Sequence, residues 1–249
     1  MARSCAAVLT VSDYSRAMLD LLGVCPRGRT QVLRNGADHI LDGAADATIL
    51  GRLGLRPRGY VLLFGSHKTY KNNRVVLDAF ARDALAPLRL VVVGPARDVL
   101  ARAGLAAPGN AVFTGGLADT ELRALYESAH CLAFPSRTEG FGLPPAEAML
   151  CGCPVVAAPA GAIPEVCRDA ALYADVDDPA GWAEAIRRFG GDAIRADKVG
   201  LGRVRAGAFT WTGAGARLER IVGALAGDAA MLAMNRDVSG SRLGELQPT

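Results

Sequence analysis

From Tyr60 onward the chain alternates short runs of valine and leucine with longer segments in which apolar and polar residues recur at helical spacing. Continuous apolar runs of this length are typical of strands buried on both faces, and amphipathic segments between them are typical of helices that cover such strands. The pattern predicts an α/β fold, a Rossmann-like parallel sheet with helices on both faces. The predicted strands are Tyr60–Phe64, Leu88–Val93, Ala111–Thr114, His130–Phe134, Val155–Ala157 and Ala171–Tyr173, and the predicted helices are Asn72–Arg82, Arg97–Ala103, Thr120–Ser128, Pro145–Leu150 and Pro179–Phe189.

The two ends of the chain follow looser patterns. The elements expected before Gly59 are a strand at Ala6–Val11, a Ser12-capped helix at Tyr14–Leu22, a strand at Thr30–Leu33 and a turn at Asn35-Gly36. A further helix is expected at Gly213–Leu225, and after it a frayed helix and a tail, since terminal segments are often loosely held. The chain is therefore expected to divide into residues 1–59, residues 60–225 and residues 226–249.

Glycines and charged residues follow the predicted strands closely. The residues that come shortly after a strand are Gly65, Lys71, Gly94, Gly115 and Glu139. In open parallel sheets the ligand binds at the carboxyl ends of the strands, where the topology switches. The sequence therefore predicts a ligand site at that edge of the sheet.

The stretch FPSRTEGFGLPPAEAM carries two carboxylates, Glu139 and Glu147, eight positions apart. The pair Pro144-Pro145 is typical of a helix start, which puts Glu139 in a glycine-bearing loop and Glu147 on the first helical turn. A helix N-terminus attracts phosphate, and glycine lets a ligand approach the backbone closely. Carboxylates accept hydrogen bonds from sugar hydroxyls. Together these features indicate a nucleotide-sugar as the ligand.

The composition is that of an ordinary globular protein. The chain has 249 residues, of which 51% are hydrophobic and 21% charged, with a net charge of +3. This small net charge gives no support for nucleic-acid binding, and the sequence contains no basic run and no series of stacking aromatic residues. The sequence contains no uncharged apolar stretch of about 18 residues, so we expect no transmembrane span.

Six cysteines are scattered along the chain. Cys131 and Cys153 lie in apolar runs, where a reduced thiol behaves as a small hydrophobic group. Cys151-Gly-Cys153 lacks a second ligand pair at zinc spacing. We therefore expect buried, reduced cysteines and a cytoplasmic location, with peripheral attachment to a membrane as an alternative.

The ordered series of motifs resembles the retaining glycosyltransferases of the GT-B fold, in particular glycosyltransferase family 4 (group 1). The segments that carry the resemblance are VLTVSDYSRAMLDLLGV, VLRNGAD, YVLLFGSHKTYKNNRVVLDAFA, LRLVVVGP, AVFTGGLADTELRALYESAHCLAFPS, the E-x7-E stretch and AGAIPEV. The resemblance implies that residues 60–225 form the donor-binding domain. It also implies that residues 1–59 are a remnant of the acceptor-side domain and its linker, as in a shortened or split reading frame.

The resemblance further implies roles for individual residues. Glu139 would hold the donor sugar, Glu147 the ribose and Lys71 the diphosphate. The other implied donor-binding residues are Gly140, Phe141, Gly142, Leu143, Ser66, Gly65 and Gly115. Ser66 follows Gly65 where the family often has an arginine, so stabilisation of the leaving group is expected to rest on Lys71 and backbone N–H groups. The family implies no metal and no other cofactor.

Each of these residues also has an explanation without a ligand. Glu139 alone is an ordinary solvated loop acid. Glu147 in a first helical turn would stabilise its helix by about 0.3–1 kcal/mol without a ligand. Without a ligand, Lys71 would be an exposed lysine at a helix start. His130 is expected to be a buried histidine with its hydrogen bonds satisfied, and His39 to be exposed.

The sequence therefore predicts a retaining glycosyltransferase that moves a sugar from a nucleoside-diphosphate sugar to a glycan or lipid-linked acceptor. One alternative is a non-catalytic fragment that binds the nucleotide-sugar without its acceptor domain. A more remote alternative is a glycoside hydrolase that uses both carboxylates. A partner chain or a dimer is expected to supply the missing half. We also expect self-association through exposed apolar edges.

Overall fold

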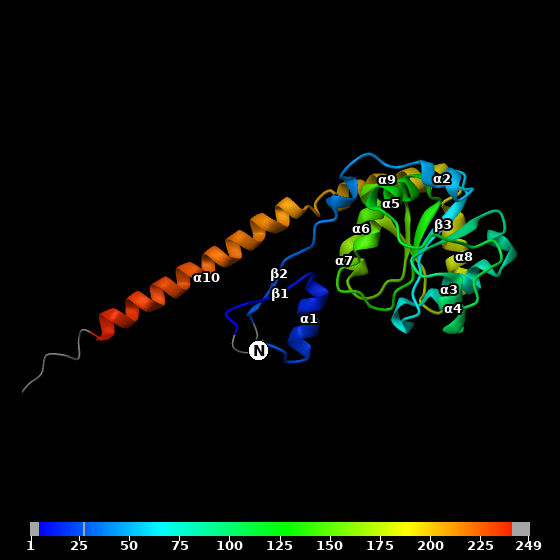
Figure 1. The fold of residues 1–249 in the computed structure, drawn as a ribbon. Coiled ribbons are helices and arrows are strands. Elements are labelled where there is room, and N and C mark those ends of the chain that lie inside the picture. The colour runs from blue at the N-terminus through cyan, green and yellow to red at the C-terminus, as the bar shows by residue number, and fades with distance from the viewer. Residues whose placement is uncertain (1–4, 27, 241–249) are drawn as a thin grey trace, which may run out of the picture.

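The computed structural model describes residues 5–26 and 28–240, and its centre is one parallel β-sheet (Figure 1). The six strands lie in the order β5-β4-β3-β6-β7-β8, and every neighbouring pair is parallel. The strands are β3 (Tyr60–Phe64), β4 (Arg89–Val93), β5 (Val112–Phe113), β6 (Cys131–Phe134), β7 (Val155–Ala157) and β8 (Ala171–Tyr173). All six strands that the sequence predicts from Tyr60 onward are present, each within one residue of its expected ends.

Helices cover both faces of this sheet. They are α3 (Asn73–Phe80), α4 (Arg97–Arg102), α5 (Asp119–Ser128), α6 (Leu143–Leu150), α7 (Ile163–Cys167), α8 (Pro179–Arg188) and α9 (Asp192–Ala206). Successive strand residues point to opposite faces. Leu62 therefore packs in one apolar layer with α5 and α6, and Val61 packs in the other with α3 and α8. This arrangement confirms the predicted Rossmann-like α/β class.

The chain order places a topological switch at β3. Strand β4 follows β3 in sequence and lies on one side of it, and β6 lies on the other. In open parallel sheets a ligand binds at such a switch, beyond the carboxyl ends of the strands. We refer to the region beyond the carboxyl ends of β3 and β6 as the crevice. The residues after β3 and β6 include Lys71 and Glu139, the two charged residues singled out by the sequence.

The N-terminal part of the chain forms a small unit beside this domain. Strands β1 (Val8–Thr10) and β2 (Thr30–Val32) pair in parallel as a separate two-stranded sheet. Helix α1 (Asp13–Leu21) is capped as predicted, since Ser12 Oγ accepts a hydrogen bond of 3.0 Å from Ser15 N. A linker with the 3-10 helix η2 (Asp38–Leu41) and helix α2 (Thr48–Arg52) leads into β3.

The last helix differs from the prediction. Helix α10 (Trp211–Gly240) projects away from the sheet and does not end near Leu225 (Figure 1). The expected end at Leu225 is therefore wrong, because Ala229–Met234 continues the helix instead of following a break. Residues 241–249 of the expected tail lie outside the described residues. Within the described chain, no helix is long and apolar enough to cross a membrane.

Candidate functional site

The loops after β3, β4 and β5 meet at three glycines. Gly65 N donates to Val93 O at 2.8 Å, and Gly94 N donates to Gly115 O at 3.2 Å. Gly94 and Gly115 have φ angles of +111° and +71°, which residues with a side chain rarely adopt. The predicted residues Gly65 and Gly115 therefore lie at one edge of the sheet.

Ser66 is held by the start of the next helix. Its backbone N–H donates to Asn73 Oδ1 at 2.5 Å, and Asn73 Nδ2 donates to Phe64 O at 3.1 Å. These bonds pin the loop after β3 onto α3. The structure thus fixes the backbone of Ser66, at the position where the resemblance leads one to expect an arginine.

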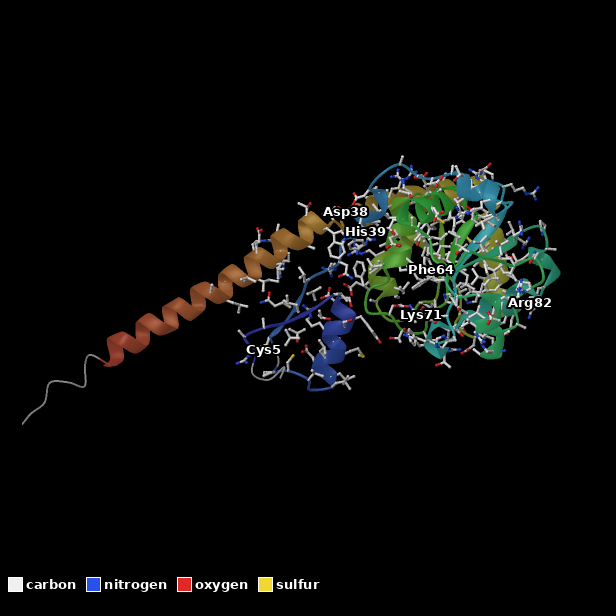
Figure 2. All side chains as sticks on the ribbon, viewed as in Figure 1. Cys5, Asp38, His39, Phe64, Lys71 and Arg82 are labelled. Atoms are coloured by element: carbon white, nitrogen blue, oxygen red, sulfur yellow. The ribbon has the colours of Figure 1, made fainter. Side chains whose placement is uncertain are left out.

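Lys71 and Glu139 form an ion pair across the crevice between β3 and β6. Lys71 lies in the 3-10 helix η3 (Thr69–Lys71), and its Nζ is 2.6 Å from Glu139 Oε1. The ammonium also lies 5.4 Å from the ring centre of Tyr70 and 5.6 Å from that of Phe134. Figure 2 labels Lys71 on this domain. Lys71 is therefore not a solvated lysine at a helix start, because aromatic faces and a carboxylate surround its charge.

The backbone of Glu139 is braced by the segment before α7. Glu139 O accepts a hydrogen bond of 3.0 Å from Ala162 N. A Cβ atom on Gly161 would lie 2.5 Å from Glu139 N, so only glycine fits there. The AGAIPEV segment of the sequence therefore fixes the position of the Glu139 loop.

Helix α6 begins two residues earlier than predicted. Its first residue is Leu143, with Gly142 before it at a φ of +98°, and both prolines lie within the first turn. Proline is tolerated there because it needs no intrahelical N–H partner. Glu147 is consequently the fifth helical residue and lies in the second turn, not in the first as expected. A first-turn electrostatic role for Glu147 is therefore excluded.

Pro144 and Pro145 have no backbone N–H, so the donors available to an anion at the start of α6 come from the loop before them and from Leu143. Among the described residues, no acceptor pairs with the backbone N–H of Gly140, Phe141, Gly142 or Leu143. Gly140 is exposed and Leu143 is half-buried, whereas Phe141 and Gly142 are buried, so the N–H groups at the two ends of this row are the ones open to an anion. Pro144 and Pro145 add none.

The side chain of Phe141 does not face the loop surface. It is buried and packs edge-to-face against Phe209, with 5.2 Å between ring centres. Only the backbone of Phe141 is therefore available to a ligand.

Glu147 is buried and both of its oxygens have partners. Tyr126 Oη donates to Glu147 Oε2 at 3.1 Å, and His39 Nε2 lies 3.3 Å from Glu147 Oε1. Burial raises the pKa of Glu147, and the hydrogen bond from Tyr126 and the proximity of His39 oppose this effect. The expectation that His39 is exposed is wrong, because a contact with α6 holds its ring.

His130 and five of the six cysteines are buried as expected, whereas Cys5 is exposed, so the expectation is wrong for Cys5. His130 is buried, its Nε2 lies 2.8 Å from Ile186 O, and burial lowers its pKa. Cys25, Cys131, Cys151, Cys153 and Cys167 are buried thiols outside any disulfide. Burial raises the pKa of Cys131, which makes it a packing residue and not a nucleophile.

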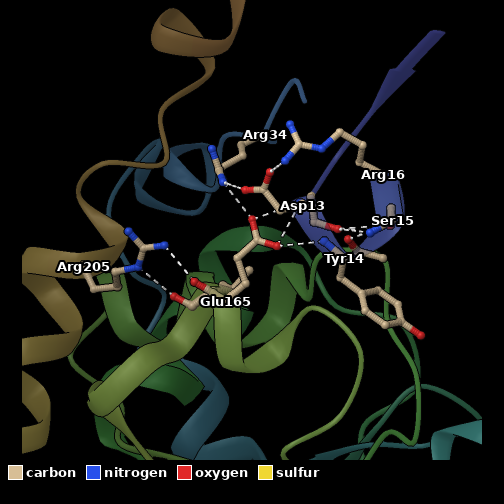
Figure 3. Close-up of polar contacts among 10 residues, drawn as sticks. Asp13, Tyr14, Ser15, Arg16, Arg34, Glu165 and Arg205 are labelled. Carbon is tan, nitrogen blue, oxygen red and sulfur yellow. Dashed lines mark hydrogen bonds and ion pairs between the residues drawn. The ribbon is translucent and has the colours of Figure 1, made fainter. Parts of the chain in front are cut away.

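Glu165 is a functional candidate that the sequence analysis missed. Its carboxylate accepts hydrogen bonds of 2.9 and 3.1 Å from Asp13 N and of 3.1 Å from Tyr14 N, at the start of α1, and it pairs with Arg34 at 2.8 Å (Figure 3). Burial alone would raise the pKa of Glu165, but these donors outweigh it and the pKa is lowered. Glu165 therefore joins the N-terminal unit to the main domain.

Solved structures share this fold. The sucrose-phosphate synthase of Thermosynechococcus elongatus superposes with a TM-score of 0.74 at 24% identity, over 91% of this chain and 60% of that one. Anabaena Alr3699/HepE, in a complex with UDP and glucose, gives a TM-score of 0.72 at 23% identity, over 89% of this chain and 63% of that one. The class defined by the fold is that of the GT-B glycosyltransferases.

Sequence comparison gives the family. Residues 58–192 match the family model described as glycosyl transferases group 1, and the chain belongs to this family. It is 34% identical to the O-antigen chain mannosyltransferase B of Escherichia coli over 221 residues, which is 82% of this chain and 57% of the relative. It is 32% identical to the D-inositol 3-phosphate glycosyltransferase of Streptosporangium roseum over 242 residues, or 88% and 55%. The chain thus spans little more than half the length of these relatives.

Proposed function

We propose that this chain forms the donor-binding half of a retaining glycosyltransferase that moves a sugar from a nucleoside-diphosphate sugar to a glycan or lipid-linked glycan. The observation that carries the proposal is the pairing of Lys71 with Glu139 at 2.6 Å, beside a loop with four unpartnered N–H groups. A cation and N–H donors suit a diphosphate, and a carboxylate suits sugar hydroxyls. The crevice therefore offers both kinds of partner that a nucleotide-sugar needs.

The diphosphate is proposed to take Lys71 from Glu139. In the ligand-free chain the two charges neutralise one another. A bound diphosphate brings more negative charge than one carboxylate and accepts from the Gly140–Leu143 loop as well, so it competes well for the ammonium. Stabilising the departing diphosphate with preorganised donors is usually the largest single term in such catalysis.

The released Glu139 is then free to accept hydrogen bonds from the hydroxyls of the donor sugar. Glu147, in the second turn of α6, is proposed to bind the ribose, since each of its oxygens has a lone pair beyond those used by Tyr126 and His39. Gly65, Ser66 and Gly115 border the ends of β3 and β5 and are proposed to line the rest of the donor site.

Retention, the absence of a metal and the acceptor class rest on the family. The named relatives transfer mannose to an O-antigen chain or act on D-inositol 3-phosphate, and the Anabaena neighbour was solved with UDP and glucose. A partner chain or a second copy is proposed to contribute the acceptor surface. A non-catalytic binder has the same donor site and differs only in lacking transfer. A hydrolase leaves Lys71 and the glycine loop without a role.

Calorimetric titration of the full chain with UDP, GDP, ADP and dTDP tests the proposal, with Lys71→Ala beside it. Lys68→Ala is the matched control, because Lys68 is a neighbouring lysine that has no carboxylate partner among the described residues. We expect one nucleotide to bind selectively and Lys71→Ala to weaken it at least about tenfold, as loss of a charged hydrogen bond does. No binding by folded wild type, or equal losses in both variants, would contradict the proposal.

A further inference from the structure

Four side chains from distant parts of the sequence form one hydrogen-bonded row that ends at Glu147. Tyr126 from α5 and His39 from η2 contact the two carboxylate oxygens at 3.1 and 3.3 Å. Trp211 Nε1, at the start of α10, lies 3.2 Å from His39 Nδ1. Figure 2 shows His39 where α10 meets the main domain. The carboxylate is therefore linked, through one imidazole, to the C-terminal helix.

The donor and the acceptor in the contact between Trp211 and His39 are fixed. An indole N–H only donates, so His39 Nδ1 accepts from Trp211 Nε1. The N–H of the imidazole is then on Nε2, which faces Glu147 Oε1 at 3.3 Å. Trp211 thus selects the tautomer of His39 that orients the carboxylate.

The backbone around Trp211 holds the row in place. Trp211 N donates to Asp38 Oδ1 at 2.8 Å, and Ala37 N donates to Phe209 O at 2.9 Å. A Cβ atom on Gly36 would lie 2.3 Å from Trp211 N, so this close approach requires glycine. The NGAD turn and the start of α10 are therefore held together by these contacts, and His39 follows directly after the turn.

We propose that His39 is a positioning residue that holds the Glu147 carboxylate for the nucleotide ribose, with Trp211 orienting His39. The inference rests on the proposed function, since it takes Glu147 to be the group that binds ribose hydroxyls. With both oxygens in contact with the protein, the orientation of the carboxylate is restricted, and a fixed carboxylate is what selective recognition of a hydroxyl pair requires. The ligand class is a ribonucleoside diphosphate, and the property controlled is its preference over the 2′-deoxy form.

The test compares UDP, GDP and ADP with their 2′-deoxy counterparts by calorimetry on the full chain. We expect wild type to bind one ribonucleotide at least about tenfold more tightly than its deoxy form. His39→Leu should bring this ratio close to one. His39→Gln should keep most of it, because a glutamine amide can donate to Glu147 and accept from Trp211. Trp211→Phe should lower the ratio in the same direction.

The possible outcomes distinguish failure of the positioning role of His39 from failure of the proposed donor-binding function. A wild type that binds neither the six nucleotides nor dTDP overturns both, and a wild type that binds dTDP alone overturns the inference. A wild type that discriminates, with His39→Leu discriminating equally well, overturns the inference alone. Equal weakening of the ribo and deoxy forms in His39→Leu also overturns it, since that is the result of a purely structural role. Loss in His39→Leu with rescue by glutamine supports it.

Discussion

Lys71 Nζ and Glu139 Oε1 lie 2.6 Å apart although the two residues are separated by 68 positions in sequence. The pair is partly shielded, with 28% and 15% of the two side chains exposed. Each group therefore holds the partner that the proposed nucleotide-sugar would need. Under the proposed function, binding exchanges these partners at the carboxyl edge of the sheet.

The exchange predicts opposite effects of Glu139→Gln on two ligands. Removing the competing carboxylate frees Lys71, so a nucleoside diphosphate without sugar should bind about two- to fivefold more tightly, a gain typical of a weak ion pair. The matching nucleotide-sugar should lose its advantage over the diphosphate, because the acceptor for the sugar hydroxyls is gone. Calorimetry with both ligands measures this, and weaker binding of both by the same factor would contradict the exchange.

Glu147→Gln should separate stability from binding. The raised pKa of Glu147 means that the folded state holds this proton more tightly than the unfolded state, whose reference value is 4.5. Wild-type stability therefore loses this contribution as pH rises above about 4.5. The melting temperature of Glu147→Gln relative to wild type should increase with pH, while nucleotide affinity falls.

Thermal melts between pH 4 and 8 measure this difference, and the surface change Glu184→Gln is its control. Uniform destabilisation of Glu147→Gln at every pH would show that Glu147 is a structural residue.

Glu165→Ala should release the N-terminal unit from the main domain. The Glu165 carboxylate accepts from Asp13 N and Tyr14 N, and these amides should exchange hydrogen faster in the variant while the amides of β3 are unchanged. The lowered pKa of Glu165 gives a pH dependence opposite to that of Glu147: the stabilising contribution of Glu165 is present above about 4.5 and is lost as pH falls through its lowered pKa. Unchanged exchange at Asp13 and Tyr14 would contradict this role.

Chelation should leave nucleotide binding intact. Under the proposed function, Lys71 and the loop N–H groups supply the positive charge that the diphosphate needs, so no metal ion is required. We expect the same dissociation constant with EDTA and with added Mg²⁺. A large loss with EDTA that Mg²⁺ restores would show that a metal carries the diphosphate.

The exposed apolar residues predict self-association. Leu21 and Leu22 at the end of α1 are 76% and 73% exposed, and Val204 on α9 is 82% exposed. Such side chains favour contact with another surface. Light scattering should show a mass that rises with concentration, and Leu21→Glu with Leu22→Glu should lower it. A monomer at all concentrations would contradict this expectation.

The strands of the sheet were predictable because the signal for each strand lies in its own short stretch of sequence. Three strands have the predicted bounds, because each is a continuous apolar run between turn residues. They are Tyr60–Phe64, Val155–Ala157 and Ala171–Tyr173. Helix α9 was missed for the opposite reason. Its buried residues are Arg195, Gly202 and Ala206, which form no apolar stripe. Arg195 is buried because it donates to the carbonyls of Ala129 and His130.

The candidate site was predictable only in part. The motif identified Lys71 and Glu139, but their contact depends on which strands are neighbours. His39 and Glu165 gain their importance from partners 172 and 152 positions away, respectively, and no local spacing encodes such contacts. Glu147 was assigned to the first turn of its helix and not to the second, because the helix start was predicted at Pro145 and lies at Leu143.

The most direct test of the donor site is an NMR titration that follows the backbone amides of Gly140, Gly142 and Leu143 as UDP, GDP, ADP or dTDP is added. We expect one nucleotide to shift these amides and that of Ser66 in a saturable way, with the dissociation constant found by calorimetry. Saturable binding that leaves these amides unmoved would mean that the nucleotide binds elsewhere, and the assignment of the site to this loop would be wrong.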